Sequence, residues 1–465
     1  MNVSGKKVTV LGAGKSGIAA AELLLVKGAE VLVSELGKID DAGRSTLHEK
    51  RIPFEESGHT EKVYDADFCV VSPGIPPSAP VIKNMQSKRI GLFSEIEIAS
   101  LYCSSKIVGI TGTDGKTTTS TLVHRICEAD GNRNGYRSYC VGNIGVPFSS
   151  KVLEMTPRDI AVVELSSYQL ERCFTFRPDV AVITNITPDH LDRYEGDIHR
   201  YAEAKFRIHA NQGPDDTLVY NADDPILREH FTDMRGNYPF RIIPFGIDCR
   251  PENLPVSSCL FLEGEAITAS SEGGKEMLIK TRDFLKNSFR GRHNIYNVLA
   301  AAAVSKALSI GNDVLCSALG EFTGVEHRQE FLATVDGVGW INDSKATNLN
   351  AMRQALEGVD GRAVLIAGGR DKGNDYSTIA ELVGRKVSLL VAIGESKEKI
   401  VSAFRDIVEV KTAWTLEEAV STARKAAVPG QTVLFSPGCS SFDMFENFED
   451  RGRQFKQCFQ QLQPC

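Results

Sequence analysis

A glycine-rich loop between a β-branched run and a helical stretch most constrains how this chain can fold. It reads Gly-Ile-Thr-Gly-Thr-Asp-Gly-Lys-Thr-Thr-Thr over residues 109–119. Such glycines let the backbone wrap a phosphate, toward which the N–H groups of the following helix point. Lys116 would neutralise the β- and γ-phosphates, and the Thr117 hydroxyl would bind Mg²⁺. Ile110 stands where the strict pattern has glycine, yet the surrounding strand and helix favour a phosphate loop over a solvated turn. The residues predicted to bind ATP here are Gly112, Thr113, Asp114, Gly115, Lys116, Thr117 and Thr118.

The order of apolar runs predicts an α/β fold with parallel sheets. A first unit shows strands at 8–11 and 30–33 around a helix at 18–27. A second has strands at 106–110, 160–163 and 180–184, a helix at 120–128, a hairpin around 270–275 and a helix at 294–307. A third has strands at 363–366, 388–393 and 432–435. We therefore expect three domains: a Rossmann-like N-terminal domain (1–98), a central P-loop-type mononucleotide-binding domain (99–323) and a Rossmann-like C-terminal domain (324–465).

Composition excludes several classes of function. The chain has 465 residues, which suits about three domains. Its net charge of −7 and the lack of a basic block argue against a nucleic-acid partner. The eleven cysteines are an odd, scattered set without a secretory segment, which predicts reduced thiols. No stretch is long enough to span a bilayer, so we expect a cytoplasmic protein without a membrane partner.

A second glycine loop, Gly-Ala-Gly-Lys-Ser-Gly over residues 12–17, ends the first strand and opens a helix. With Glu35 about 20 residues on, it satisfies the dinucleotide-binding fingerprint, which alone would suggest NAD. The same glycine geometry serves any diphosphate, however. A full dinucleotide domain is also hard to fit into the ~95 residues before the phosphate loop.

Three further motifs carry a resemblance to a known family. They are Val-Glu-Leu-Ser-Ser-Tyr-Gln-Leu at 163–170, Asn-Ile-Thr-Pro-Asp-His-Leu-Asp-Arg-Tyr at 185–194 and Tyr-Ala-Glu-Ala-Lys at 201–205. Together with the phosphate loop, they resemble the central-domain motifs of the Mur ligases and the related folylpolyglutamate synthetases. The Ser-Ser-Tyr-Gln-Leu segment is most similar to the D-glutamate-adding members.

The resemblance implies how metal and nucleotide bind. Glu164 would help Thr117 hold a first Mg²⁺, while His190 and Lys205 would serve a second. In the family this lysine is carbamylated, which turns a cation into an oxygen donor suited to a hard metal. Two asparagines three residues apart, Asn294 and Asn297, would reach the nucleotide base. In the motifs at 327–328 and 341–348, Arg328 would contact the phosphates, Asp343 the ribose and Lys345 the reacting centre. The implied catalytic residues are Lys116, His190, Lys205 and Lys345.

The resemblance also assigns the two substrates. The first glycine loop would bind the diphosphate of UDP-N-acetylmuramoyl-L-alanine. Where one member of the family carries an Asp-Thr-Arg run, this chain reads Glu-Leu-Gly at 35–37, so no uracil contact is predicted beyond Glu35. The residues implied for this substrate are Gly14, Lys15, Ser16, Gly17, Glu35, Ser72, Gly74, Asn143 and Ser166. Those implied for D-glutamate are Thr347, Lys372, Ser441, Phe442 and Phe448.

The implied reaction has two steps. The substrate carboxylate attacks the γ-phosphoryl group of ATP to give an acyl phosphate, and the amine of D-glutamate then displaces phosphate. We expect a monomer in cytoplasmic peptidoglycan precursor synthesis. The alternatives within the class are a sibling Mur ligase or a folylpolyglutamate synthetase. Outside it stand a nucleotide-dependent oxidoreductase and a catalytically silent UDP-sugar-binding regulator.

Overall fold

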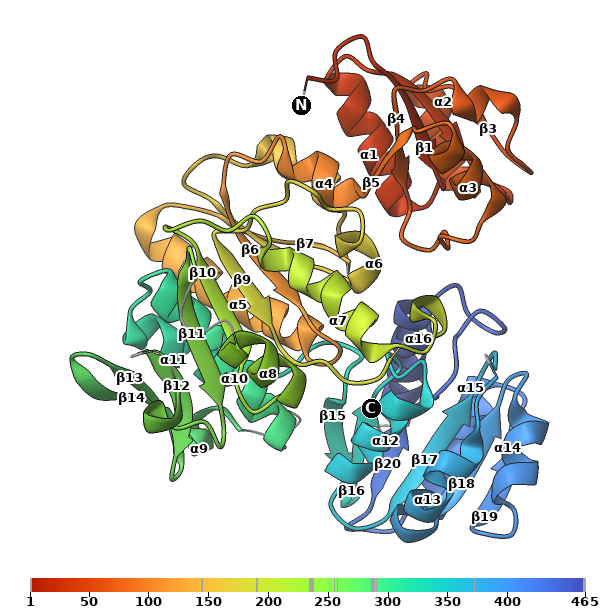
Figure 1. The fold of residues 1–465 in the computed structure, drawn as a ribbon. Coiled ribbons are helices and arrows are strands. Elements are labelled where there is room, and N and C mark those ends of the chain that lie inside the picture. The colour runs from red at the N-terminus through yellow and green to blue at the C-terminus, as the bar shows by residue number, and fades with distance from the viewer. Residues whose placement is uncertain are drawn as a thin grey trace. The chain divides into compact units, whose positions relative to one another are not determined.

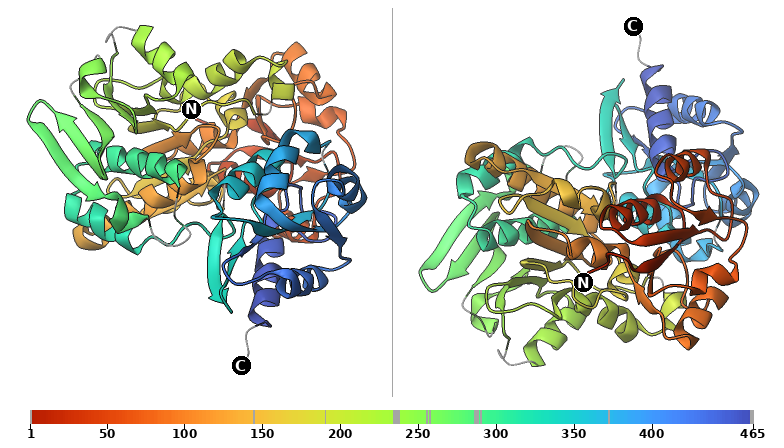
Figure 2. Two further views of the ribbon diagram at one scale, coloured as in Figure 1. Left: turned by 90° about the horizontal axis from the view of Figure 1, so that it is seen from below. Right: turned by 90° about the horizontal axis from the view of Figure 1, so that it is seen from above.

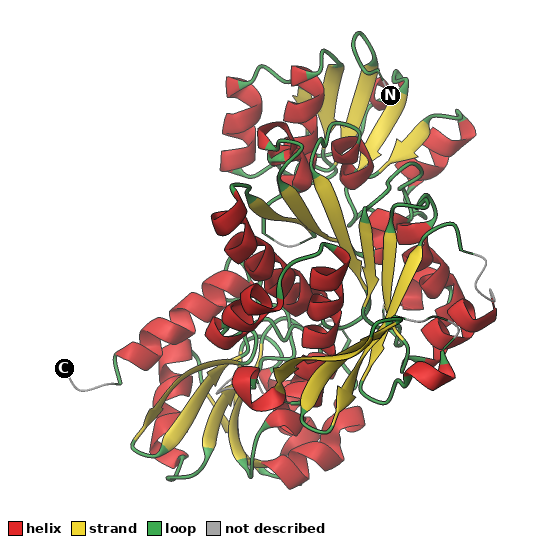
Figure 3. Cartoon of the chain, turned by 90° about the vertical axis from the view of Figure 1, so that its left-hand side faces the viewer, coloured by secondary structure: helices red, strands yellow, loops and turns green. Residues whose placement is uncertain are grey.

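The computed structural model contains three α/β sheets divided between two compact units (Figure 1). It describes residues 2–143, 145–189, 191–233, 238–254, 256, 258–285, 289, 291–371 and 373–462. The first unit comprises residues 1–284 and 292–321, and the second comprises 285–291 and 322–465. The first unit holds two of the sheets and the second unit holds the third. The prediction of three α/β domains is thus confirmed at the level of the sheets, which are flanked by helices (Figure 3).

The N-terminal sheet has five parallel strands in the order β3-β2-β1-β4-β5. The strands are β1 (Lys7–Leu11), β2 (Glu30–Ser34), β3 (Phe54–Glu55), β4 (Phe68–Val71) and β5 (Gly91–Phe93). The helices are α1 (Lys15–Val26), α2 (Asp41–Glu49), α3 (Pro80–Ser87) and α4 (Glu95–Ser100). The order reverses between β1 and β4, and open α/β sheets bind ligands at such a switch point, beyond the carboxyl ends of the strands.

The middle sheet has nine strands in the order β14-β13-β12-β11-β10-β9-β6-β8-β7. The pairs from β7 to β12 are parallel, and β12, β13 and β14 continue the sheet as antiparallel strands whose hairpin forms its outer edge (Figure 2). The strands are β6 (Lys106–Thr111), β7 (Ser138–Gly142), β8 (Ile160–Glu164), β9 (Val180–Ile183), β10 (Thr217–Asn221), β11 (Arg241–Gly246), β12 (Cys259–Glu263), β13 (Ala266–Ser271) and β14 (Gly274–Lys280). The helices are α5 (Lys116–Asn134), α6 (Ser167–Leu170), α7 (Ile198–Phe206), α8 (Pro225–Asp233), α9 (Thr281–Phe284), α10 (Arg292–Ala307) and α11 (Asn312–Glu321).

The sheet of the second unit has six strands in the order β15-β16-β20-β17-β18-β19, and only the β15–β16 pair is antiparallel. The strands are β15 (Glu330–Val335), β16 (Val338–Asn342), β17 (Ala363–Gly368), β18 (Val387–Ile393), β19 (Glu409–Thr412) and β20 (Thr432–Phe435). The helices are α12 (Leu349–Gly358), α13 (Ala380–Lys386), α14 (Lys397–Phe404), α15 (Leu416–Ala426) and α16 (Phe448–Gln460).

The central strands are buried on both faces, as parallel strands covered by helices must be. Every residue is buried in the strands β4, β8, β9, β10 and β17, and all residues but one are buried in β20. The apolar runs read from the sequence therefore marked true strands. The ten described cysteines are all free, and seven of them are buried. Within the described part of the chain, no helix has the length and apolar character needed to cross a membrane.

Candidate active site

The phosphate loop leaves β6 and enters α5 through two glycines with positive φ. Gly112 has φ +146°, and Gly115, the N-cap of α5, has φ +81°. A Cβ atom would lie 1.9 Å from Thr184 Oγ1 at the first and 2.4 Å from Asn297 Oδ1 at the second. Glycine is thus required at both places by conformation and by space. The predicted helix start at residue 120 was late, because Gly115 lets α5 begin at Lys116.

The segment after β9 holds this loop in place through hydrogen bonds. Asn185 accepts from Thr113 N through its carbonyl oxygen (2.9 Å) and from Asp114 N through Oδ1 (2.9 Å), and its Nδ2 donates to Asp114 O (3.0 Å). Thr184 Oγ1 donates to the same carbonyl at 2.6 Å. The sequence prediction gave Asn185 no role, although it opens a motif that was singled out.

Two lysines donate to one carbonyl oxygen of the loop. Lys116 Nζ lies 2.9 Å from Gly112 O and 2.7 Å from Thr113 O, and Lys205 Nζ lies 2.7 Å from Gly112 O. Lys205 is 1% exposed and lies over the ring of Tyr201, 4.4 Å from its centroid. Burial, followed by the positive charge of Lys116, holds the pKa of the Lys205 ammonium well below its usual value. The buried lysine therefore loses its proton more readily than a surface lysine.

Glu164 ends β8 and is 2% exposed. Its Oε1 accepts from Asn143 Nδ2 at 3.1 Å, and Thr117 stands buried in the first turn of α5. A carboxylate and a hydroxyl are oxygen donors of the kind that Mg²⁺ prefers, so these two residues fit a hard metal. His190 lies outside the described residues. Among the described ones, no group of three or more His, Cys, Asp or Glu side chains could hold a metal ion.

A cavity of about 240 Å³ joins these elements to the N-terminal sheet. Three residues predicted for the UDP substrate (Gly74, Asn143 and Ser166) line it together with the two lysines. Ser166 caps α6 in a reciprocal arrangement with Gln169. The cavity is also lined by residues that the prediction missed, namely Pro73, Ser167, Tyr168, Asp189 and Tyr201.

The first glycine loop lies at the switch point of the N-terminal sheet. A Cβ atom on Gly17 would lie 1.9 Å from Gly12 O, so the helix can approach the loop only with glycine there. Ser72 Oγ faces the same carbonyl at 3.4 Å. α1 begins after Gly14 without a side-chain cap, which leaves its first N–H groups for a ligand. The carboxylate of Glu35 is already hydrogen-bonded within the protein: its two oxygens accept from Ala13 N (2.9 Å) and Gly37 N (3.0 Å).

The two asparagines of α10 lie on one helical face and bond to each other. Asn297 Nδ2 donates to Asn294 Oδ1 at 3.1 Å, and Asn297 Oδ1 accepts from Thr119 Oγ1 at 3.2 Å. Both asparagines are buried. Asn297 therefore contacts α5 just beyond the phosphate loop.

In the second unit, Asp343 follows β16 and is buried. Its Oδ2 accepts from Ser436 Oγ at 2.8 Å and its Oδ1 from Gln329 N at 3.1 Å. Burial raises the pKa of this carboxyl to about 7, against these hydrogen bonds and the nearby charge of Arg328. Lys345, two residues on, places Nζ 6.0 Å from the ring centroid of Phe448.

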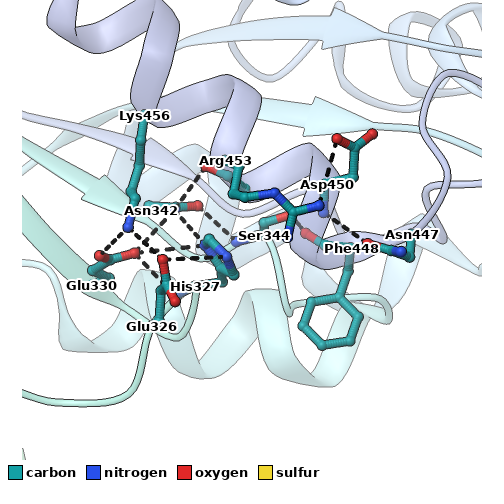
Figure 4. A network of polar contacts seen from close by, with 11 residues as sticks. Glu326, His327, Glu330, Asn342, Ser344, Asn447, Phe448, Asp450, Arg453 and Lys456 are labelled. Carbon is teal, nitrogen blue, oxygen red and sulfur yellow. Dashed lines mark hydrogen bonds and ion pairs between the residues drawn. The ribbon is translucent and has the colours of Figure 1, made fainter. Parts of the chain in front are cut away.

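A network of hydrogen bonds and ion pairs surrounds Asn342, the residue before Asp343 (Figure 4). Asn342 Nδ2 lies 3.0 Å from His327 Nδ1 and 3.1 Å from Glu330 Oε2, and Lys456 Nζ bonds Glu330 Oε1 at 3.0 Å. His327 has φ +62° and accepts from Lys345 N through its carbonyl oxygen. The network therefore fixes the turn that carries Arg328, as well as the backbone of Lys345.

Of the residues predicted for D-glutamate, Ser441 is buried, Thr347 and Phe448 are half-buried, and Phe442 is 60% exposed. Lys372 lies outside the described residues. The prediction missed Arg451, a fully buried guanidinium on α16 that donates to Ser344 Oγ (3.0 Å), Ser344 O (2.7 Å) and Cys439 O (3.0 Å). It links the loop that carries Asp343 to the loop that carries Ser441.

Known proteins match this arrangement along the whole chain. Residues 7–81 match the MurD N-terminal domain, residues 110–305 the Mur ligase middle domain, and residues 327–439 the Mur ligase glutamate ligase domain. The UDP-N-acetylmuramoylalanine--D-glutamate ligase of Pelodictyon phaeoclathratiforme is 64% identical over 99% of both chains. That of Chlorobium phaeobacteroides is 62% identical over 98% of both. The solved MurF ligase of Thermotoga maritima, in complex with ADP, shares the fold with a TM-score of 0.58, at 17% identity over 99% of this chain and 95% of that one.

Proposed function

The chain belongs to the Mur ligase family, and we propose that it joins D-glutamate to UDP-N-acetylmuramoyl-L-alanine with ATP, in the synthesis of peptidoglycan precursors. It is an ATP-dependent ligase, like the family to which it belongs. We propose that each of the three matched segments belongs to a domain with its own function, with domain boundaries at 98/99 and 323/324. Residues 1–98 bind the UDP substrate, 99–323 bind ATP and 324–465 bind the amino acid.

The observation that carries this proposal is the 240 Å³ cavity. It is lined by Gly74, from the loop after β4, together with Lys116 of the phosphate loop and the buried Lys205. If the first glycine loop holds the diphosphate of the UDP-linked substrate, the carboxylate of that substrate would enter this cavity, where Lys116 neutralises the transferred phosphoryl group of ATP. An oxidoreductase would need no such pair of lysines next to a phosphate loop.

The residues of the chain account for the two steps. The phosphate loop wraps the ATP phosphates, and Lys116 neutralises the charge that builds up as the carboxylate attacks the γ-phosphoryl group. Phosphoryl transfer requires positioning and charge stabilisation more than covalent help from the protein, which fits a cavity lined by lysines and hydroxyls. The side chains of the second unit (Thr347, Lys372, Ser441, Phe442 and Phe448) bind D-glutamate so that its amine attacks the acyl phosphate.

Arg328, Asp343, Asn294 and Asn297 complete the nucleotide contacts, and Lys345 acts at the reacting centre. Mg²⁺ would be held by Thr117 and Glu164, with a second ion served by His190 and Lys205, and it would supply further neutralisation of the phosphates. Lys205 is carbamylated in this proposal. The lowered pKa of its amine supports that reaction, because the neutral amine is the form that combines with CO₂. We further propose a cytoplasmic monomer whose partners are these small molecules.

Phosphate release tests the function. Purified protein is given ATP, Mg²⁺ and UDP-N-acetylmuramoyl-L-alanine, with D-glutamate, L-glutamate, L-alanine, L-lysine or diaminopimelate as the amine. Release that requires D-glutamate is the expected result. Release with another amine would move the chain to a sibling ligase. No release with any amine, together with a thermal shift from NAD(H), would favour the oxidoreductase alternative.

The carbamate has its own test. Protein equilibrated with ¹³C-bicarbonate should show a carbamate carbon signal by NMR that the Lys205→Arg variant lacks. Arginine keeps the positive charge but has no amine that can react with CO₂ near neutral pH. A signal of equal strength in the variant would place the carbamate elsewhere.

A further inference from the structure

Arg193 has no role in the site described so far, yet its side chain is only 8% exposed. It lies in the short 3-10 helix Leu191–Tyr194. Nε and Nη2 donate to the two carboxylate oxygens of Glu171 at 3.3 and 2.8 Å, and Nη1 donates to Pro73 O at 3.2 Å. The guanidinium also covers the ring of Tyr168, 4.0 Å from its centroid. All three nitrogens therefore have partners, and one face of the guanidinium covers an aromatic ring.

These partners belong to two different sheets. Pro73 stands in the loop after β4 of the N-terminal sheet, whereas Tyr168 and Glu171 belong to α6 and its end, after β8 of the middle sheet. Pro73 and Tyr168 both line the 240 Å³ cavity, next to Lys116 and Lys205. Arg193 therefore stands behind the cavity wall and joins its two sides.

The substrate of the proposed reaction must contact both sides at once. Its UDP end rests on the N-terminal sheet, and its carboxylate must reach Lys116, at the start of α5 beside the middle sheet. A ligand held at two subsites gains affinity only while their separation matches its length. Misplacement of a reacting group by ~1 Å can cost ~100-fold in rate. A rigid link between the two sheets at this point therefore affects the part of the substrate that spans them.

We propose that Arg193 is a positioning residue that holds the Pro73–Gly74 loop against the middle sheet. Through this link, a substrate bound by its UDP end presents its carboxylate to Lys116 of the phosphate loop. This inference rests on the proposed function.

The test compares Arg193→Lys with Arg200→Lys. Lysine keeps the charge at position 193, but one ammonium cannot bond Pro73 and both oxygens of Glu171 while it covers Tyr168. Arg200 is a matched control, because it lines a neighbouring cavity with Arg193 but is half-exposed and pairs only with Glu195 and Asp197 in the described contacts. Calorimetry gives the Kd of UDP and of UDP-N-acetylmuramoyl-L-alanine for each variant, and kinetics give the KM for ATP.

In Arg193→Lys, we expect the complete substrate to bind about tenfold more weakly, while UDP alone and ATP change by less than about twofold. Arg200→Lys should leave all three within about twofold. A variant that merely folds less well would reduce the active fraction without separating the two affinities. Equal weakening of UDP and of the complete substrate, or no change in either, would overturn the proposal.

A second variant guards against misfolding at position 193. Glu171→Gln keeps the Pro73 contact available and weakens only the ion pair, so it should show the same selective loss at a smaller size. A larger loss than in Arg193→Lys would contradict the role given to Pro73. If the wild-type protein bound no UDP at all, the proposed function itself would fail, and this inference with it.

Discussion

The phosphate-loop edge of the middle sheet and the Asp343 edge of the second unit each bury an ionisable side chain at the carboxyl ends of parallel strands. At the first edge, Lys205 donates to the Gly112 carbonyl, which also receives Lys116. At the second, Asp343 accepts from a hydroxyl and a backbone N–H group. Burial lowers the pKa of the lysine and raises that of the carboxyl to about 7.

The difference shows how a fold prepares for an anionic ligand. Two lysines converge on one neutral carbonyl, and burial together with the positive charge of Lys116 lowers the pKa of Lys205, so the cation that an incoming anion meets at this edge is Lys116. The carboxyl group at the Asp343 edge accepts hydrogen bonds from the protein itself. Because burial raises its pKa, the free energy lost by ionising this group depends on pH. We therefore expect the phosphate-loop edge to respond most strongly to loss of a cation and the Asp343 edge to respond to protons.

The largest effect should come from Lys116→Ala. Removing a cation from the phosphoryl group should lower kcat for phosphate release by about 10³-fold, which is the scale of removing one preorganised charge or donor. Lys151→Ala is the control, because Lys151 pairs only with Glu154 at the surface in the described contacts. A Lys116→Ala variant that kept a tenth of the activity would refute the importance given to this edge.

Asp343→Asn tests the other edge through pH. The folded pKa of about 7 exceeds the unfolded value of about 3.9, so the stability this group contributes is present below pH ~4 and is lost as pH rises to ~7. Asparagine does not ionise, so the free energy of unfolding of Asp343→Asn, relative to that of the wild type, should increase as the pH rises over this range, by at most about 4 kcal/mol. Urea unfolding of both proteins at pH 5 and pH 8 measures this. A constant difference at the two pH values would contradict the raised pKa.

A partly buried histidine in the first unit, His209, should respond to pH with the opposite sign. Burial lowers the pKa of His209 to about 4, and its Nε2 has no hydrogen-bond partner among the residues that the structure describes. Because the folded pKa lies below the unfolded one, wild-type stability falls as pH drops from ~6.5 toward ~4. His209→Phe should remove this loss, by at most about 3 kcal/mol at pH 4. His48, an exposed histidine on α2, supplies the His48→Phe control, whose acid sensitivity should stay that of the wild type.

Substitution of two glycines, one at each edge, should have the smallest of these effects. Gly112 (φ +146°) and Gly369 (φ +141°) stand in the loops of the two edges, where alanine is strained by about 1–3 kcal/mol. The alanine Cβ would meet Thr184 Oγ1 in the first case and the backbone oxygen of Ser440 in the second. Thr184→Ala should therefore recover part of the stability lost in Gly112→Ala, as thermal unfolding of the double mutant would show. For Gly369→Ala the obstacle is backbone, and Ser440→Ala should recover nothing.

The sequence predicted those parts of the fold whose pattern is local. The strands at 8–11, 106–110 and 432–435 were found because each is a short apolar run buried on both faces. The antiparallel pair β15–β16 was not predicted, since half-buried strands such as β15 carry a weaker pattern than fully buried ones. Helix starts were misplaced where a glycine turn, as at Gly115, allows the helix to begin inside a motif.

The site could be predicted only in part, for a related reason. Glu164 ends β8 and Lys116 comes a few residues after β6, so the apolar runs before them indicate a position at the sheet edge. Asn185 and Arg193 act by hydrogen bonds to segments more than 70 residues away in the chain, and such partners are visible only after folding. Glu35 was predicted as a ligand contact, whereas in the structure it also braces the glycine loop beside it.

The β13–β14 hairpin gives the protein a convenient handle. Its turn, Glu272-Gly273, is exposed, and β14 is the outermost strand of the middle sheet. Six strand spacings separate β14 from β6, which amounts to about 29 Å at ~4.8 Å per strand. A fluorophore or a short peptide tag inserted at this turn would therefore report on the enzyme, or immobilise it, without reaching the phosphate loop.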